Sequence, residues 1–175
     1  MKQSIVISVL GDDKPGLVES LSQLIVEHQG EWVESRMASL AGKFAGILSV
    51  SLPKENIESF KTALQNSEKL CLKVMFEDSL ASNHGIASKT YHIELLGQDQ
   101  PGIIHKISSV LARLNASVDE LYTEVVEASM SGEQLFKANI ELQVPADVSA
   151  ALIQQELEHL ANELIVDIAL QPSEN

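Results

Sequence analysis

Several residue types are scarce in this chain of 175 residues, and each scarcity excludes a class of function. Cys71 is the only cysteine, so an internal disulfide and a thiolate cluster for zinc or iron–sulfur are both excluded. Lysine and arginine number 12 against 25 aspartates and glutamates, which gives a net charge of −13. Such a charge repels phosphate backbones, so we expect no direct binding to DNA or RNA.

Long hydrophobic runs are also missing. The apolar segment at residues 5–10 ends at Gly11 and is too short for the apolar region of a signal peptide. No later stretch approaches the roughly 20 apolar residues of a membrane span. We therefore expect a cytoplasmic protein that makes no contact with a membrane. Hydrophobic residues still make up 45% of the chain, which is enough to build a buried core.

A nine-residue segment occurs twice. Residues 10–18, Leu-Gly-Asp-Asp-Lys-Pro-Gly-Leu-Val, match residues 96–104, Leu-Gly-Gln-Asp-Gln-Pro-Gly-Ile-Ile. Before each segment apolar residues alternate with polar ones, which predicts a strand with one buried face. After each segment apolar residues recur at i, i+4, i+7 and i+8, which predicts an amphipathic helix. The same strand is therefore followed by the same helix in both copies.

The rest of each copy continues the repeat. Two middle strands are predicted at about 31–40 and 44–52, and again at about 117–126 and 134–144, where the connection is six residues longer. Pro53 and Pro145 are each expected to open a second helix, because proline suits a first helical turn. The alternation of Leu70, Leu72, Val74 and Phe76 predicts a closing strand that includes Cys71, and the apolar run 165–170 predicts its counterpart.

The order strand, helix, strand, strand, helix, strand predicts an α+β protein of two ferredoxin-like βαββαβ domains. Each would have a four-stranded antiparallel sheet with two helices on one face. We place the domains at residues 1–77 and 89–175, with residues 78–88 as a linker rich in small and turn-forming residues. The open face of the first strand, Ser4, Val6 and Ser8, is not apolar enough to demand burial. Sheet edges and helix ends are therefore the expected contact surfaces, and a homodimer is a candidate assembly.

The repeated Gly-x-Asp-x-Pro-Gly turn is the candidate ligand site, and it has two interpretations. In the first, Asp13 and Asp99 cap the helix that follows, and the turn is purely structural. In the second, the free N–H groups at the helix start bind the carboxylate of an amino acid, while the aspartate faces its ammonium. In either interpretation the first glycine lets the chain leave the strand sharply.

These two turns, each between a strand and a helix, resemble the signature of ACT domains, small βαββαβ modules that bind amino acids in metabolic regulators. A chain made only of two such units is similar to the glycine cleavage system transcriptional repressor family. Members of that family respond to glycine and contact a DNA-bound activator rather than DNA. The resemblance implies ligand sites at the following residues: Gly11, Asp12, Asp13, Gly16 and Leu17 in the first copy, and Gly97, Asp99, Gly102 and Ile103 in the second. Asp12 is replaced by Gln98 in the second copy, so the two sites need not be equivalent.

Enzyme motifs are missing from the sequence. It contains no nucleotide-binding glycine loop, no His-Glu-x-x-His and no Gly-x-Ser-x-Gly, so we expect no catalysis, no cofactor and no metal. The leading hypothesis is an amino-acid-responsive co-regulator of transcription, with glycine as effector and a transcriptional activator as protein partner. The alternative is a regulatory subunit that binds and allosterically controls an enzyme of amino-acid metabolism. A stand-alone enzyme is the third hypothesis.

Overall fold

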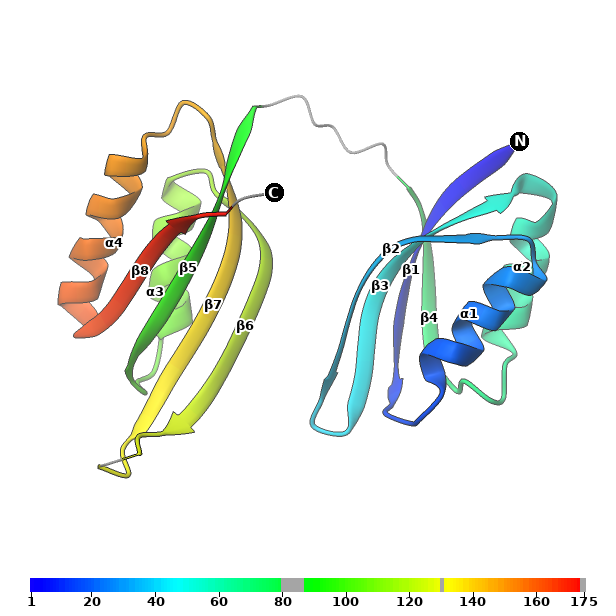
Figure 1. The fold of residues 1–175 in the computed structure, drawn as a ribbon, viewed down its shortest axis with the longest axis horizontal. Coiled ribbons are helices and arrows are strands. Elements are labelled where there is room, and N and C mark those ends of the chain that lie inside the picture. The colour runs from blue at the N-terminus through cyan, green and yellow to red at the C-terminus, as the bar shows by residue number, and fades with distance from the viewer. Residues whose placement is uncertain (80–86, 130, 174–175) are drawn as a thin grey trace. The chain divides into compact units, whose positions relative to one another are not determined.

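The computed structural model describes residues 1–79, 87–129 and 131–173, and Figure 1 shows two units, each with a sheet that carries helices on one face. By its internal contacts the chain divides into Met1–Ser82 and Asn83–Asn175. The predicted linker, residues 78–88, spans this division, and its residues 80–86 lie outside the described residues. The domain boundaries at 77 and 89 therefore stay predictions.

The first unit has the predicted order of elements. They are β1 (Lys2–Asp12), α1 (Leu17–Glu27), β2 (Glu31–Leu40), β3 (Lys43–Pro53), α2 (Ile57–Gln65) and β4 (Lys73–Asp78), with a short 3-10 helix, Lys54–Asn56, before α2. The sheet order is β2-β3-β1-β4, and every neighbouring pair is antiparallel. The two connections that carry helices place β1 between β3 and β4, which is the ferredoxin-like arrangement.

The second unit repeats this topology. Its elements are β5 (Ser88–Gln98), α3 (Ile103–Arg113), β6 (Ser117–Glu127), β7 (Gln134–Pro145), α4 (Ala150–Leu164) and β8 (Val166–Pro172). The sheet order is β6-β7-β5-β8, again antiparallel throughout. The fold class predicted from the sequence, two α+β ACT-type domains, is confirmed.

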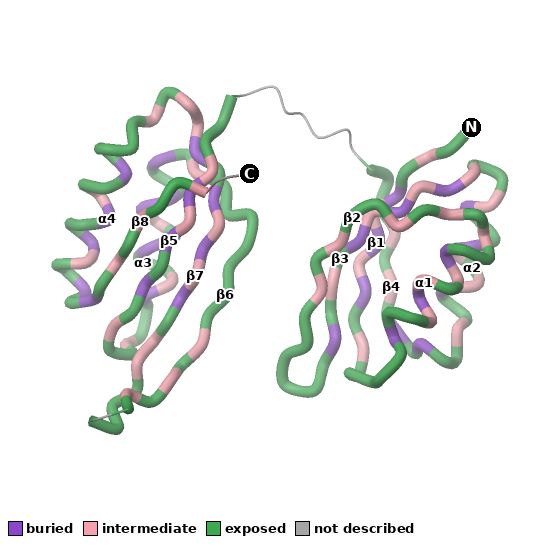
Figure 2. Tube along the Cα trace, viewed as in Figure 1, coloured by how far each residue is buried: buried purple, intermediate pink, exposed green. Residues whose placement is uncertain are grey.

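Alternation along the first strand of each unit decides which face is buried. Ile5, Ile7 and Val9 of β1 are at most 3% exposed and pack beneath the helices, as the buried segments of Figure 2 show. A fully buried side chain of this size contributes roughly 1.5–3 kcal/mol to folding. The helices supply the other half of each core through the predicted stripe, for example Leu21 and Ile25 of α1.

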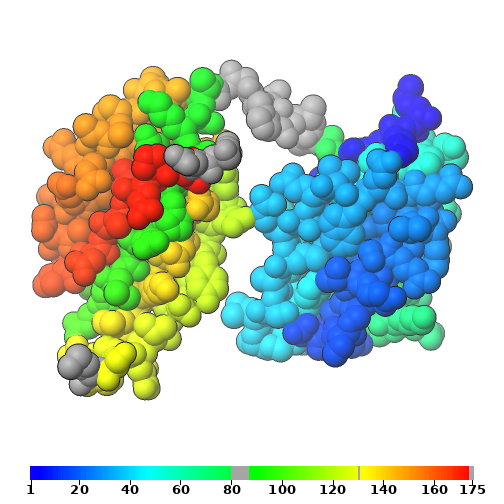
Figure 3. Space-filling view, in the orientation of Figure 1, coloured from blue at the N-terminus to red at the C-terminus, as the bar shows by residue number. Residues whose placement is uncertain are grey.

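Each unit has a hydrophobic core of its own. The core of the first unit includes Phe60 of α2, which is fully buried and meets the ring of His28 edge-on at 5.6 Å. The core of the second unit includes Ile93 of β5 and Ile153 of α4, both fully buried. Side chains fill the spaces that the ribbons leave between helices and strands (Figure 3). Each sheet therefore packs against its own pair of helices.

The prediction that Pro145 opens a helix is wrong. Pro145 is the last residue of β7, and α4 begins only at Ala150. Ser149 caps that helix, because its hydroxyl accepts a 3.2 Å hydrogen bond from the amide of Leu152. Pro53 likewise ends β3. Proline is tolerated at a strand end, where a missing N–H breaks no ladder bond, and serine is the stronger helix cap.

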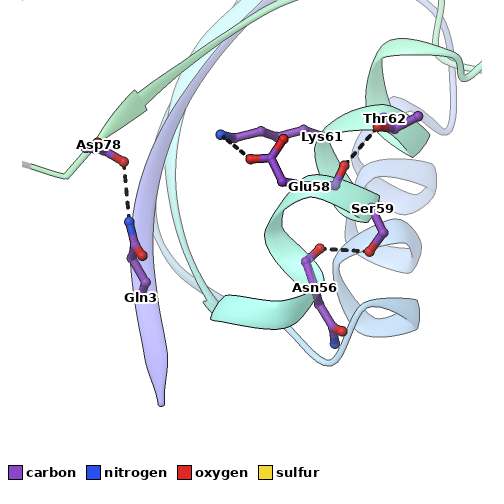
Figure 4. A network of polar contacts seen from close by, with 7 residues as sticks. All are labelled: Gln3, Asn56, Glu58, Ser59, Lys61, Thr62 and Asp78. Atoms are coloured by element: carbon purple, nitrogen blue, oxygen red, sulfur yellow. Dashed lines mark hydrogen bonds and ion pairs between the residues drawn. The ribbon is translucent and has the colours of Figure 1, made fainter.

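Polar contacts at the start of α2 tie the first unit together (Figure 4). The hydroxyl of Ser59 donates a 2.9 Å hydrogen bond to the carbonyl of Asn56. The side-chain amide of Asn56 in turn donates to the carbonyl of His28, also at 2.9 Å, which joins the start of α2 to the end of α1. On the sheet, Gln3 donates to Asp78 at 3.4 Å. These contacts hold α2 and β4 against the earlier elements.

The closing strand β4 begins at Lys73, so the prediction that Cys71 lies within it is wrong. Cys71 has a φ of 49° and turns the chain, while Leu70 and Leu72 on either side are still buried in the core. Its thiol is exposed and donates to the carbonyl of Glu68 at 2.8 Å. Ile165 has a φ of 55° just before β8, so the same turn is made in both units. The alternation of buried and exposed residues at 70–72 therefore comes from packing against the core and not from an extended strand.

Candidate functional site

Two glycines start the first helix of each unit in the left-handed backbone conformation. Gly16 has φ 86° and ψ 6°, and Gly102 has φ 88° and ψ 5°. Glycine adopts these angles without the strain that a Cβ brings. A Cβ built on either glycine would meet no atom within 4 Å, so the space beside both turns is open. The repeated motif therefore makes one geometry twice, and conformation requires glycine at its end.

Neither helix start is capped by a side chain among the described residues. The helix caps that the first interpretation assigns to Asp13 and Asp99 are therefore not formed. The two aspartates instead use their backbone: the amide of Asp13 donates to the carbonyl of Gly42 at 3.0 Å, and that of Asp99 to Gln134 at 3.1 Å. These bonds fasten each turn to the neighbouring hairpin. The exposed carboxylates remain beside helix starts whose N–H groups attract anions.

Asp12, another predicted site residue, belongs to an ion pair. It lies opposite Lys43 in the ladder between β1 and β3, and the Lys43 ammonium donates to its carboxylate. This hydrogen bond, and then the charge of Lys43, holds the pKa of Asp12 below its usual range. Gln98 replaces Asp12 in the second unit and lies opposite Leu135, so no such pair forms there. The Asp12 carboxylate is thus ionised and already paired with the Lys43 ammonium next to the first turn.

The first glycine of each motif has a different role from the one expected. Gly11 and Gly97 lie within β1 and β5, so neither releases the chain from its strand. A Cβ on Gly11 would lie 2.7 Å from the Leu72 side chain, and one on Gly97 would lie 2.2 Å from the Val166 side chain. Close packing against the residues at the start of the closing strand, Leu72 just before β4 and Val166 in β8, therefore favours glycine at both positions.

The residues after the left-handed glycines point inward. Leu17 is 5% exposed and Ile103 is 2% exposed, and each belongs to the core of its unit. Their side chains are therefore not available to a ligand bound outside the turn. What both positions offer is the backbone N–H at the first turn of the helix.

The two turns differ in how they are held. In the second unit the Gln100 side chain donates a 2.8 Å hydrogen bond to the carbonyl of Leu164, at the end of α4. In the first unit the equivalent residue is Lys14, which is exposed. An open hollow of about 410 Å³ lies beside the second turn, and its lining includes Gly97, Asn162 and Asp167. The two candidate sites therefore have the same backbone but different surroundings.

Sequence reasoning missed Lys43 and Gln100 as parts of these turns. Lys43 follows the hairpin turn at Gly42, and only the strand register shows that it faces Asp12. Gln100 lies within the motif itself, and its replacement of Lys14 is the signal that the second turn is held differently.

Across residues 1–79, 87–129 and 131–173, no three His, Cys, Asp or Glu side chains group in a way that could hold a metal ion. None of the helices in those ranges combines the length and the apolar character that crossing a membrane requires.

The βαββαβ topology with a Gly-x-Asp-x-Pro-Gly turn before the first helix defines the class of protein. A family model described as "ACT domain" matches residues 3–77. A UPF0237 protein of Methanopyrus kandleri is 34% identical over 79 residues, which are 45% of this chain and 82% of that protein. The chain belongs to the ACT-domain family, and the repeated fold makes it a tandem ACT protein.

Other relatives match over nearly the whole chain. The glycine cleavage system transcriptional repressors of Escherichia coli and Shigella flexneri are each 22% identical over 161 residues, covering 91% of this chain and 85% of the relative. A crystal structure of an unknown protein from Galdieria sulphuraria is 28% identical with a TM-score of 0.84, covering 99% of this chain and 100% of its own. A crystal structure described as a glycine cleavage system transcriptional repressor is 21% identical with a TM-score of 0.74. The match covers 100% of this chain and 99% of that one. These relationships support a regulatory role.

Proposed function

We propose that this protein is an amino-acid-responsive co-regulator of transcription, with glycine as effector, that contacts a DNA-bound activator. The observation that carries the proposal is the doubled turn with a left-handed glycine, an uncapped helix start and an exposed aspartate. The similarity to glycine cleavage system transcriptional repressors supports the choice of process. The cell compartment that fits this role is the cytoplasm.

The chemistry of the turn matches a small zwitterion. An α-carboxylate accepts hydrogen bonds from helix-start N–H groups, and an α-ammonium pairs with a carboxylate. Gly16 and Asp13 supply both in the first unit, and Gly102 and Asp99 supply both in the second. The turn recognises only the α-carboxylate and the α-ammonium, so the choice of glycine rests on the similarity to the glycine cleavage system transcriptional repressors.

Contact with a protein rather than with DNA follows from charge. The chain carries a net charge of −13, which opposes a phosphate backbone and attracts a basic protein surface. Most of that charge is in the second unit: residues 83–175 hold 14 acidic and 4 basic residues. The second unit is therefore the half of the chain that we expect to attract the activator.

Calorimetric titration with a panel of free amino acids tests the effector. We expect binding of glycine to weaken at least about tenfold in Asp13→Asn or Asp99→Asn, because the ammonium loses its charged partner while the side-chain shape is kept. Asp147→Asn, in an exposed loop, is the matched control and should leave binding unchanged. If no amino acid binds the unmodified protein, the sensing part of the proposal is refuted.

A second function has support from the same turns: a regulatory subunit that controls an enzyme of amino-acid metabolism. Affinity capture from an extract of the source cells, with and without glycine, separates the two. Recovery of a transcription factor supports the co-regulator, and recovery of a biosynthetic enzyme supports the regulatory subunit. Fluorescence anisotropy with duplex DNA adds a direct check, since tight binding by the protein alone would contradict contact through an activator.

A further inference from the structure

The face of the first sheet that points away from its helices carries an apolar patch. Because Ile5, Ile7 and Val9 face the helices, Val6 and Leu10 of β1 face the opposite way. The neighbouring strands extend this surface, which we call the outer face of the first sheet: Val6, Leu10, Ala45, Ile47 and Met75. The exposed fractions are 46% for Leu10, 53% for Ile47 and 64% for Met75.

The strand register makes this patch continuous. Ile47 of β3 and Met75 of β4 both lie opposite Ser8, one on each side of β1. Ala45 lies opposite Leu10 in the next row. A groove on the same surface is lined by Val6 and Ile47, with Glu34 and Arg36 of β2 along its side. The first strand alone gives little sign of this patch, because Ser8 lies at its centre and Ile47 and Met75 come from the strands on either side.

The second sheet shows that the fold does not require an apolar outer face. By the offset of the repeat, His92 takes the place of Val6. By strand register, Asn139 and Ala169, which lie opposite Glu94, take the places of Ile47 and Met75. The nitrogens of His92 lie 2.6 Å from a Glu141 oxygen and 3.4 Å from a Glu94 oxygen. The outer face of one unit is therefore polar and that of the other is apolar, which indicates that the apolar face meets a partner.

Two charges of opposite sign on β4 favour a second copy of the same surface as the partner. Glu77 lies opposite Val6, Lys73 lies opposite Leu10, and Met75 lies between them. Neither charge has an ion-pair partner among the described residues. When two such faces meet with their strands reversed, Glu77 of each copy lies over Lys73 of the other, about 13 Å along the strand from its own lysine. The apolar rows then meet each other at the centre, and one surface is complementary to itself.

We propose that the outer face of the first sheet binds the outer face of the first sheet in a second copy of this chain, as a two-fold symmetric dimer. Sheets pack face to face at about 10 Å, which suits side chains of the size of isoleucine and methionine. A strongly charged partner would leave the apolar row unmatched, whereas a second copy matches the apolar row together with Lys73 and Glu77 of β4. This interface is independent of the proposed ligand sites.

Sedimentation equilibrium on the full chain tests the apolar part of the interface. We expect the unmodified protein to have the mass of a dimer. The double variant Ile47→Asn, Met75→Ala, which installs in both places the residue types of the second sheet, should raise the dissociation constant at least about tenfold. Val26→Ala removes apolar surface from a residue 70% exposed on α1 and is the matched control, expected to leave the dimer unchanged. Circular dichroism checks that each variant is folded.

A charge exchange tests the orientation. Glu77→Lys or Lys73→Glu alone places like charges against each other and should weaken the dimer, while the two substitutions together should restore it. A monomeric unmodified protein overturns the proposal, as does a dimer that the double variant leaves intact. A dimer weakened by both single charge variants but not restored by their combination refutes the reversed arrangement. If the apolar substitutions change only the stability of a monomer, the patch is covered within the chain and the proposal is also overturned.

Discussion

The side chain of Gln100 donates a 2.8 Å hydrogen bond to the carbonyl oxygen of Leu164, which joins the second glycine–proline turn to the last residue of α4. The last carbonyls of a helix have no partner within the helix, so this bond satisfies a group that would otherwise depend on water. Both turns share the backbone bond from the aspartate to the neighbouring hairpin, but the first unit has Lys14 at the position of Gln100 and adds the Asp12–Lys43 pair instead. The two turns share a backbone but are fastened at different points.

Gln100→Ala should loosen the second turn. Loss of one partly buried hydrogen bond costs about 1 kcal/mol, and we expect faster amide hydrogen exchange in residues 98–102 and around Ile165. Lys14→Ala is the matched control and should leave exchange in the first turn unchanged. Equal effects of the two substitutions would contradict the asymmetry.

Lys43→Met should return the pKa of Asp12 to its ordinary value of about 4. In the folded protein the hydrogen bond from Lys43 lowers that pKa, so the pair stabilises the fold above the ordinary carboxyl pKa. That contribution is lost as the pH falls through the lowered pKa. Carboxyl chemical shifts from an NMR titration measure it, and high salt should reduce the difference.

The second unit supplies the control for this titration. The ammonium of Lys106 donates to Glu163 at 2.8 Å and lowers the pKa of that carboxyl in the same way. Lys106→Met should therefore raise the pKa of Glu163 and leave Asp12 unchanged. A shift of Asp12 in both variants would point to a long-range effect of net charge instead of a paired contact.

The two glycines of one motif should differ in their tolerance of a methyl group. Gly102→Ala meets no atom within 4 Å, so its cost is the left-handed backbone, about 1 kcal/mol. Gly97→Ala would place a carbon 2.2 Å from the Val166 side chain and should cost about 3 kcal/mol. Urea denaturation measures both. Val166→Ala should recover part of the loss at Gly97 and nothing at Gly102, since only the former involves a clash.

Phe60→Ala should unfold the first unit and spare the second. Phe60 is completely buried among residues of the first core, and its removal leaves a cavity that costs about 3–5 kcal/mol. Ile153→Ala, at a fully buried position of the other core, should have the reverse effect. Hydrogen exchange resolved along the chain distinguishes the two, and loss of protection in both units from either substitution would show that the cores unfold together.

The candidate site could be predicted only in part. The motif correctly located both turns, because Gly16 and Gly102 occupy conformations that few other residues adopt. The roles of the residues around these glycines could not be predicted from the sequence. Asp13 was a credible helix cap by spacing, but its side chain makes no cap hydrogen bond to α1, and its backbone amide donates to Gly42 of the adjacent hairpin. Proline at position 145 likewise fits a helix start locally, yet Ser149 makes the better cap four residues on.

The fold followed from the printed sequence alone because its signals are short-range: alternation marks strands, a period near 3.6 marks helices, and a duplicated motif marks the two domains. Contacts between distant residues depended on the three-dimensional structure. Asp12 and Lys43 are 31 residues apart, and Gln100 and Leu164 are 64 apart. Ile47 and Met75 became one surface only when both strands paired with β1. Alternation along a strand determines which of its faces is buried, but which residues of two strands lie opposite each other depends on the turn between them and on the packing of the whole sheet.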